Sequence, residues 1–166
     1  SMVGMVRMHS SAVIVLGGSG ISILGQAVLD HVDGDYALTG EGEANFPLLL
    51  EEVAGSTRPG SIPGVYARQA KYASFVPPVR CADFGASGMQ HWIDWRRYER
   101  RGATWPIQCK RGCPHRCTYC TYPAIEGREL RIRSVDDVVA EISRVSREVG
   151  PRCFEFVDSV FNLPEE

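Results

Sequence analysis

The sequence predicts an α/β protein in which helices cover small parallel sheets. In the first third of the chain, two short apolar runs end at glycine-rich turns and alternate with helical patterns. In the last third, a strand and a strongly amphipathic helix are followed by a second strand. This alternation is typical of parallel sheets, whose strands are joined by helical crossovers. A stretch rich in glycine and proline separates the two regions.

Two strands are expected in the first 55 residues, at 12–16 and 36–39. Both are apolar enough to be buried on two faces. They end at Gly17–Gly20 and Gly40–Glu43, turns at which the backbone can approach a neighbouring group closely. A helix through residues 27–29 is expected to link the two strands. The order of elements therefore predicts a parallel strand pair in this region.

The next helix is expected to begin at Pro47, a residue that suits the first turn of a helix. Residues 56–104 then lose the regular pattern and are rich in glycine and proline. We interpret this stretch as a linker with helix near residues 92–101 and a small hairpin of strands 65–68 and 73–76.

Regular structure is expected to resume with a strand at residues 105–108. The strongest helix signal follows, because Ser134 and Asp137 form a capping-box pair and valines and isoleucine recur on one face up to Val149. A strand at residues 153–157 comes next. Strand, loop, helix and strand together form one βαβ unit.

Composition excludes several classes of protein. Hydrophobic residues make up 44% and charged residues 23% of the 166 residues, as in folded globular chains. No apolar run approaches the roughly 18 residues of a membrane helix, and the N-terminus lacks a signal-peptide pattern. We therefore expect a cytoplasmic protein that makes no membrane contact.

Charge is nearly balanced, with 18 Lys and Arg against 20 Asp and Glu and a net charge of −2. A dedicated nucleic-acid-binding domain would be strongly basic, so nucleic acid is not the expected partner. The charge is uneven, however, because residues 96–133 contain ten basic and three acidic residues, a local excess of +7. Such a stretch is either a solvated face or a site for an anion, a phosphate or an acidic protein.

The cysteines carry the strongest functional signal. Four of the six, Cys109, Cys113, Cys117 and Cys120, lie within twelve positions. Structural zinc is one interpretation, although zinc sites usually combine two C-x2-C pairs, and only the last two cysteines have that spacing. A second interpretation is an iron–sulfur cluster, because three thiolates at C-x3-C-x2-C spacing can bind three irons and leave a fourth open for substrate. Clustering at this density argues against chance.

The segment Arg111–Cys120 resembles the signature of the radical S-adenosylmethionine superfamily, including the aromatic residue before the last cysteine. Its surroundings resemble the subgroup with a cobalamin-binding domain ahead of the radical domain. Tyr122-Pro123 and the segment 126–134 follow the loop as in that subgroup, and residues 156–162 resemble its second-strand motif. Upstream, Val15–Gly18 and Gly40–Glu43 resemble the last two strand ends of its cobalamin domain.

The resemblance implies that Cys113, Cys117 and Cys120 ligate a [4Fe-4S] cluster whose open iron chelates S-adenosylmethionine. Reductive cleavage would then release a 5′-deoxyadenosyl radical. Tyr119 would lie near the adenine, and Asp158 is a candidate for binding the methionine amino group, with a strand-terminal cap as the equal alternative. Cys109 falls outside the motif.

The resemblance also implies a role for basic and glycine residues. Arg128, Arg131 and Arg133 are candidates for contacting an anionic substrate, although solvation is the favoured account of at least two of them. Candidates for contacting the cobalamin tail are the turn glycines Gly17, Gly18, Gly40 and Gly42, for which tight packing is an equally good explanation.

The same resemblance predicts the domain organisation. Residues 1–55 would form the C-terminal part of a doubly wound, cobalamin-binding sheet, residues 56–104 the linker, and residues 105–166 the first βαβ unit of a partial (β/α) barrel. The family's remaining strands and its D-x-H-x-x-G segment are missing here. We therefore expect a segment of a larger enzyme that is inactive alone, and exposed sheet edges that favour self-association.

The expected activity is radical S-adenosylmethionine chemistry on a small-molecule substrate, with methyl transfer from cobalamin as one form. The electron donor would be a reductase, a flavodoxin or a ferredoxin. Two alternatives remain. One is a zinc-stabilised module that contacts RNA through the basic stretch. The other is an RNA-modifying enzyme resembling methylthiotransferases, against which stands the lack of upstream cysteines other than Cys81 for a second cluster.

Overall fold

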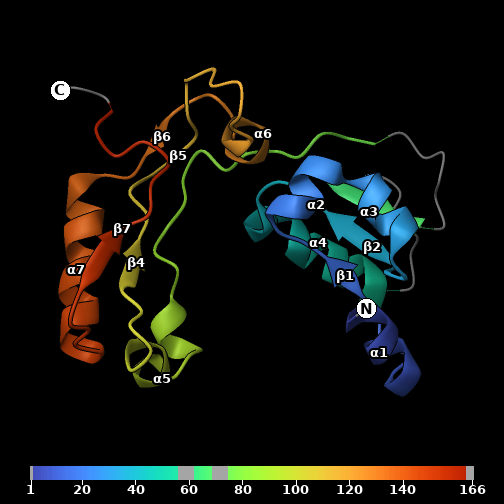
Figure 1. Ribbon diagram of the computed structural model, residues 1–166, viewed down its shortest axis with the longest axis horizontal. Coiled ribbons are helices and arrows are strands. Elements are labelled where there is room, and N and C mark those ends of the chain that lie inside the picture. Colours follow the sequence, from blue (N-terminus) through green and yellow to red (C-terminus); the bar gives the residue numbers. More distant parts are fainter. Residues whose placement is uncertain (1, 56–61, 69–74, 164–166) are drawn as a thin grey trace. The chain divides into compact units, whose positions relative to one another are not determined.

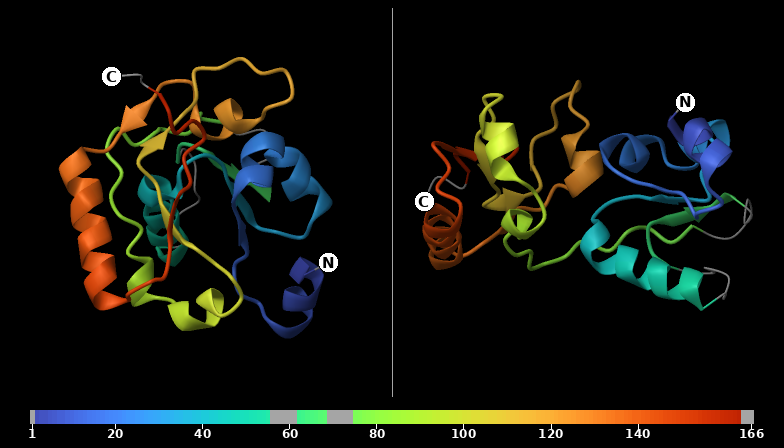
Figure 2. Two further views of the ribbon diagram at one scale, coloured as in Figure 1. Left: turned by 60° about the vertical axis from the view of Figure 1, so that its left-hand side comes forward. Right: turned by 90° about the horizontal axis from the view of Figure 1, so that it is seen from below.

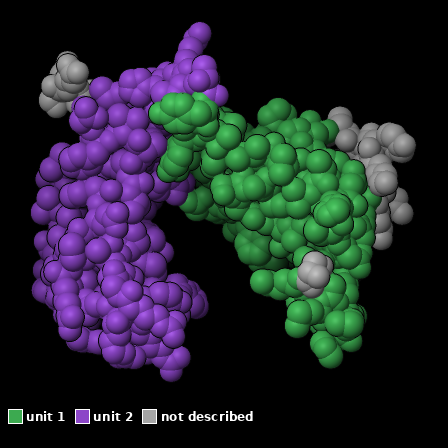
Figure 3. All heavy atoms as spheres, viewed as in Figure 1, with its two compact units in different colours: residues 1–81, 119–126 green, residues 82–118, 127–166 purple. Residues whose placement is uncertain are grey.

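The computed structural model describes residues 2–55, 62–68 and 75–163 as a mixed α/β protein (Figure 1). The chain divides into two compact units, coloured separately in Figure 3. The first unit comprises residues 1–81 and 119–126, and the second comprises residues 82–118 and 127–166. Within the described residues, no helix is long and apolar enough to cross a membrane.

The first unit contains a three-stranded sheet in the order β1-β2-β3. β1 (Val15–Leu16) and β2 (Tyr36–Leu38) are parallel, as expected, and β3 (Val65–Ala67) runs antiparallel to β2. The expected hairpin in this region is therefore not the pairing that β3 makes. Its second strand includes residues 73 and 74, which lie outside the described residues.

Helices cover both faces of this sheet. The crossover from β1 to β2 consists of α2 (Ser19–Leu24) and α3 (Gln26–His31), and α4 (Gly42–Ala54) follows β2. Figure 2 shows α4 on the opposite side of the sheet from α2 and α3. The core contains Ile21, Leu29 and Ala37, with Leu29 and Ala37 fully buried. This packing of helices against parallel strands is the arrangement that the alternating pattern predicts.

In the first unit, α3 contains the expected helical residues 27–29, whereas the preceding α2 was not predicted. The crossover is broken at Gly25, where φ is +49° and a β-carbon would approach the Tyr66 ring to 2.8 Å. Both the positive φ and the nearby ring favour glycine at this position, which lies between α2 and α3. The helix expected from Pro47 instead begins at Gly42, and Pro47 lies inside it.

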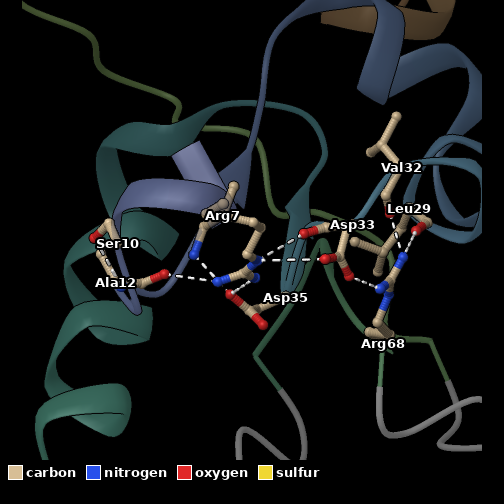
Figure 4. A network of polar contacts seen from close by, with 9 residues as sticks. Arg7, Ser10, Ala12, Leu29, Val32, Asp33, Asp35 and Arg68 are labelled. Carbon is tan, nitrogen blue, oxygen red and sulfur yellow. Dashed lines mark hydrogen bonds and ion pairs between the residues drawn. The ribbon is translucent and has the colours of Figure 1, made fainter. Parts of the chain in front are cut away.

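A polar network anchors the N-terminal helix α1 (Met2–His9), which the sequence did not predict (Figure 4). Arg7 Nη2 donates to Asp35 Oδ2 at 2.5 Å, and the backbone N–H of Ile14 donates to the same oxygen at 2.7 Å. Asp33 pairs with both Arg7 and Arg68. Burial of Asp35 opposes its ionisation, but these hydrogen bonds and charges prevail and lower its pKa below 3.8.

The second unit is built on one parallel strand pair, β4 (Trp105–Ile107) and β7 (Phe154–Phe156). α7 (Val135–Glu148) is the crossover helix, as predicted, and runs beside both strands in Figure 1. The Ser134 side chain caps it by accepting from the Asp137 N–H at 3.1 Å. α5 (Trp95–Glu99) precedes β4. Together these elements bury one core, which contains Trp95, Trp105, Ile107, Val138 and Val145.

The segment between β4 and α7 holds a second, antiparallel ladder that the sequence did not predict. β5 (Lys110–Arg111) pairs with β6 (Arg131–Ile132). α6 (Tyr122–Glu126) lies between them in the sequence but belongs to the first unit, where it packs against α2. The cysteine loop thus starts directly from a hydrogen-bonded strand.

Candidate functional site

The base of the cysteine loop is tightly constrained in the second unit. Gly112 has φ of +90°, and a β-carbon there would lie 2.0 Å from the carbonyl oxygen of Glu129. Only glycine allows this approach of the two backbones. The N–H of Cys113 donates to the Gly127 carbonyl at 3.0 Å, and the Gly112 carbonyl accepts from Ser159 Oγ at 2.9 Å. The first motif cysteine is therefore fixed from two directions.

The remaining motif residues are open to solvent. Cys113 is buried, whereas Cys117 and Cys120 are exposed and Tyr119 is 88% exposed. Cys113 and Cys117 belong to the second unit, and Tyr119 and Cys120 are grouped with the first. Among the described residues, no three His, Cys, Asp or Glu side chains form a group that could hold a metal ion. Two of the three motif thiols are therefore accessible, and the described residues form no assembled metal site.

Asp158, the candidate at the end of β7, caps the start of β5. Its Oδ1 accepts from the N–H groups of Cys109 at 2.8 Å and Lys110 at 3.0 Å. This is the geometry of a strand-terminal cap. Its Oδ2 is buried and has no hydrogen-bond partner among the described residues. A carboxylate oxygen in that state can still accept from a ligand.

Cys109, outside the motif, is chemically distinct from the exposed thiols. It is half-buried beside Asp158. Burial, followed by the negative charge of Asp158, raises the pKa of the Cys109 thiol above 9.0. A thiol that resists ionisation is a poor metal ligand and a poor nucleophile.

Two of the basic residues considered for anion binding have structural partners. Arg133 and Glu141 form a nearly inaccessible ion pair at 2.6 Å, and Arg133 also donates to the Gln108 carbonyl at 2.8 Å. Arg128 Nη1 donates to the His115 carbonyl at 2.9 Å and so braces the cysteine loop. Arg133 is thus held by structural contacts, whereas Arg128 is exposed to solvent apart from this bond.

Two further residues at this site, Lys110 and Ser159, were not candidates individually, although each lies in a segment that the sequence singles out. Lys110 is buried, and its Nζ donates to the carbonyls of Phe161, at 2.7 Å, and Leu163. Ser159 holds Gly112, as described above. Both act on residues distant in sequence, so no local pattern marks them.

The candidate glycines of the first unit lie where the parallel strands β1 and β2 end. Gly17 and Gly18 follow β1, and a β-carbon at either would meet no atom within 4 Å. Gly40 follows β2 with φ of +74°, and its N–H donates to Ser22 Oγ at 3.0 Å. Gly42 begins α4. The carboxyl ends of parallel strands are the usual place for a ligand in such sheets.

A cavity of about 330 Å³ lies at this edge of the first unit. Gly40 lines it together with Ser22, Thr39 and the stacked rings of Tyr66 and Phe75. Gly17, Gly18 and Gly42 are not among its lining residues. The structure thus brings one of the four candidate glycines to a cavity.

Comparison with known proteins identifies relatives along most of the chain. No protein-family model matches it. The hopanoid C-3 methylase of Methylococcus capsulatus is 30% identical over 78% of this chain and 26% of its own length. A Methanocaldococcus jannaschii protein named as a methylthiotransferase is 28% identical over 86% of this chain and 29% of its own length.

Solved structures agree with these matches. The radical S-adenosylmethionine methyltransferase TsrM of Kitasatospora setae, with tryptophan and a S-adenosylmethionine analogue bound, has a TM-score of 0.79 and 26% identity over 98% of this chain. The match covers 32% of TsrM, so the chain spans between a quarter and a third of these relatives. TsrM has also been solved with cobalamin and a [4Fe-4S] cluster bound. Over most of its length, this chain is a relative of the cobalamin-binding radical S-adenosylmethionine enzymes.

Proposed function

We propose that this chain supplies the cluster-binding loop and part of the cobalamin-binding sheet of a cobalamin-dependent radical S-adenosylmethionine methyltransferase. The observation that carries the proposal is the cysteine loop itself. Its three thiols have C-x3-C-x2-C spacing, and at the base of the loop the backbone of residue 112 approaches Glu129 so closely that only glycine fits. The relatives of this chain include methyltransferases. In this assignment, residues 1–55 belong to the cobalamin domain, 56–104 to the linker and 105–166 to the start of a partial barrel.

The residues present fit the three cofactors. Cys113, Cys117 and Cys120 would hold a [4Fe-4S] cluster, since thiolates are its usual ligands and two of these thiols are freely accessible. The buried, unpartnered Oδ2 of Asp158 would accept from the methionine ammonium, and the exposed ring of Tyr119 would lie against the adenine. A reduced cluster held there would supply the electron for reductive cleavage of S-adenosylmethionine.

The turns after β1 and β2 would contact cobalamin. A β-carbon at Gly17 or Gly18 would meet no atom within 4 Å, so there is space beside the backbone for a ligand. Gly40 lines the 330 Å³ cavity at the same sheet edge. Gly42 would allow α4 to begin close to the ligand. Cobalamin held there would supply the methyl group for transfer to a substrate carbon.

The proposal extends to partners. A small-molecule substrate would suit a family in which TsrM binds tryptophan. A reductase, flavodoxin or ferredoxin would supply the electron.

Metal analysis after anaerobic reconstitution tests the proposal. We expect about four irons and four sulfides per chain in the wild type, in keeping with three thiolate ligands of a cubane cluster. Cys117→Ala should lose most of the iron, whereas Cys153→Ala, which removes an exposed thiol outside the loop, should retain it. Stoichiometric zinc without sulfide would contradict the proposal and favour a zinc-stabilised module.

A further inference from the structure

A buried ammonium ties the segment after β7 to the residues that precede the cysteine loop. Lys110 is 7% exposed and donates from Nζ to the carbonyls of Phe161 and Leu163. The same ammonium lies 5.6 Å from the centre of the Phe161 ring, within the range of a cation–π interaction. Burying a lysine is unfavourable unless its donors are satisfied, so these acceptors hold the side chain in a single position.

The other contacts of this segment converge on the same few residues. Asp158 Oδ1 accepts from the backbone of Cys109 and Lys110, and Ser159 Oγ donates to the Gly112 carbonyl. Residues 158–163 are thus attached at their beginning by Asp158 and Ser159 and at their end by Lys110. These bonds join residues 109–112 to residues 158–163.

We propose that Lys110 is a positioning residue for S-adenosylmethionine. By fixing the end of the 158–163 segment, it keeps Asp158 in place with Oδ2 available for the methionine ammonium. This inference rests on the proposed function, because it takes Asp158 to be the amino-group ligand. Without the Lys110 ammonium, binding would have to order the segment itself, and that ordering reduces affinity.

Lys110→Met tests the inference, since methionine keeps the length of the side chain and removes its three donors. In the full chain carrying its cluster, we expect iron content to be unchanged and the dissociation constant for S-adenosylmethionine to rise about tenfold. Lys110→Arg, which keeps a cationic donor, should bind within about threefold of the wild type. Arg152→Met serves as the control, because it removes one highly exposed positive charge from the same unit.

Hydrogen–deuterium exchange gives a readout that does not depend on the cluster. In Lys110→Met, backbone amides of residues 158–163 should exchange at least tenfold faster than in the wild type, and those of α7 should be unchanged. Unaltered affinity and exchange would overturn the inference, as would equal losses in Arg152→Met or a parallel loss of iron in Lys110→Met. A wild type that assembles no cluster would overturn the proposed function itself, and this inference with it.

Discussion

Gly112 and Gly102 illustrate two different reasons why a position can require glycine. Both have positive φ, +90° and +84°, but a β-carbon at Gly102 would meet nothing within 4 Å, whereas one at Gly112 would collide with Glu129. Gly102→Ala therefore incurs conformational strain alone, about 1 kcal/mol. Gly112→Ala must also push apart the two backbone segments, at residues 112 and 129, that meet at the base of the loop.

We therefore predict that Gly112→Ala lowers the free energy of unfolding by about 3 kcal/mol or more, and Gly102→Ala by about 1 kcal/mol. Urea unfolding followed by tryptophan fluorescence measures both changes, because Trp92, Trp95 and Trp105 all lie in the second unit. Equal losses for the two variants would show that the contact with Glu129 is not a constraint on the fold.

The six thiols should differ in reactivity because of their surroundings. Burial and the Asp158 carboxylate raise the pKa of Cys109, so less of its reactive thiolate is present at pH 8 than for an ordinary thiol. We predict that iodoacetamide labels Cys109 more slowly than the exposed Cys153 in the metal-free protein, as measured by peptide mass spectrometry. Raising the pH to 9.5 should narrow the difference. Faster labelling of Cys109 at pH 8 would contradict this account.

Among the elements, α7 is the one that local sequence determines most completely. Its cap was predicted, and Val138, Ile142, Val145 and Val149 of its apolar face pack in the core, because these features depend on residues within a few positions of one another. Val135 and Val139, which share the apolar pattern, are exposed instead. The requirement for glycine between α2 and α3 was not predicted, because the Tyr66 ring that approaches Gly25 lies 41 positions away in the chain. Long-range contacts of this kind leave no local pattern.

The cap of α7 gives a prediction at this scale. Ser134→Ala removes the acceptor for the Asp137 N–H and should lower the free energy of unfolding by about 1 kcal/mol. Ser146→Ala, an exposed site inside the same helix, should be neutral or slightly stabilising because alanine favours helix. Chemical denaturation of the two variants makes the comparison, and a smaller loss for Ser134→Ala than for Ser146→Ala would contradict the capping role.

The candidate site was predictable from sequence only where a motif is contiguous. The three cysteines lie within eight positions, and their spacing alone suggests the cluster. Lys110 and Ser159 contact each other's segments across almost 50 positions of chain, so their roles emerge only when β4 and β7 pair. Arg133 and its buried partner Glu141 on α7 are only eight positions apart, but no motif marked them as a pair.

At the scale of the whole molecule, each unit has its own hydrophobic core. The polar network of Arg7, Asp33, Asp35 and Arg68 stabilises only the first unit, whereas all the tryptophans report on the second. Disruption of that network should therefore change the unfolding seen by circular dichroism more than the unfolding seen by fluorescence.

Asp35→Asn provides the test, with the exposed Asp30→Asn as its control. We predict that Asp35→Asn destabilises the first unit by about 1–3 kcal/mol at pH 7, because Arg7 loses the nearer of its two ionic partners. The pKa of Asp35 is lower in the folded state than its ordinary value of 3.8. The stabilisation is therefore fully present above pH 3.8 and is lost as the pH falls through the pKa of the folded state. An identical shift of the fluorescence transition would indicate that the two units unfold together.

The central claim is that the cysteine loop holds a cluster that binds S-adenosylmethionine. Electron paramagnetic resonance of the reduced, reconstituted chain, recorded with and without S-adenosylmethionine, tests it most directly. We predict a cluster signal whose g-values change when S-adenosylmethionine is added, with a weaker response in Asp158→Asn at equal iron content. A fully loaded wild-type cluster whose spectrum is the same with and without S-adenosylmethionine would contradict the account.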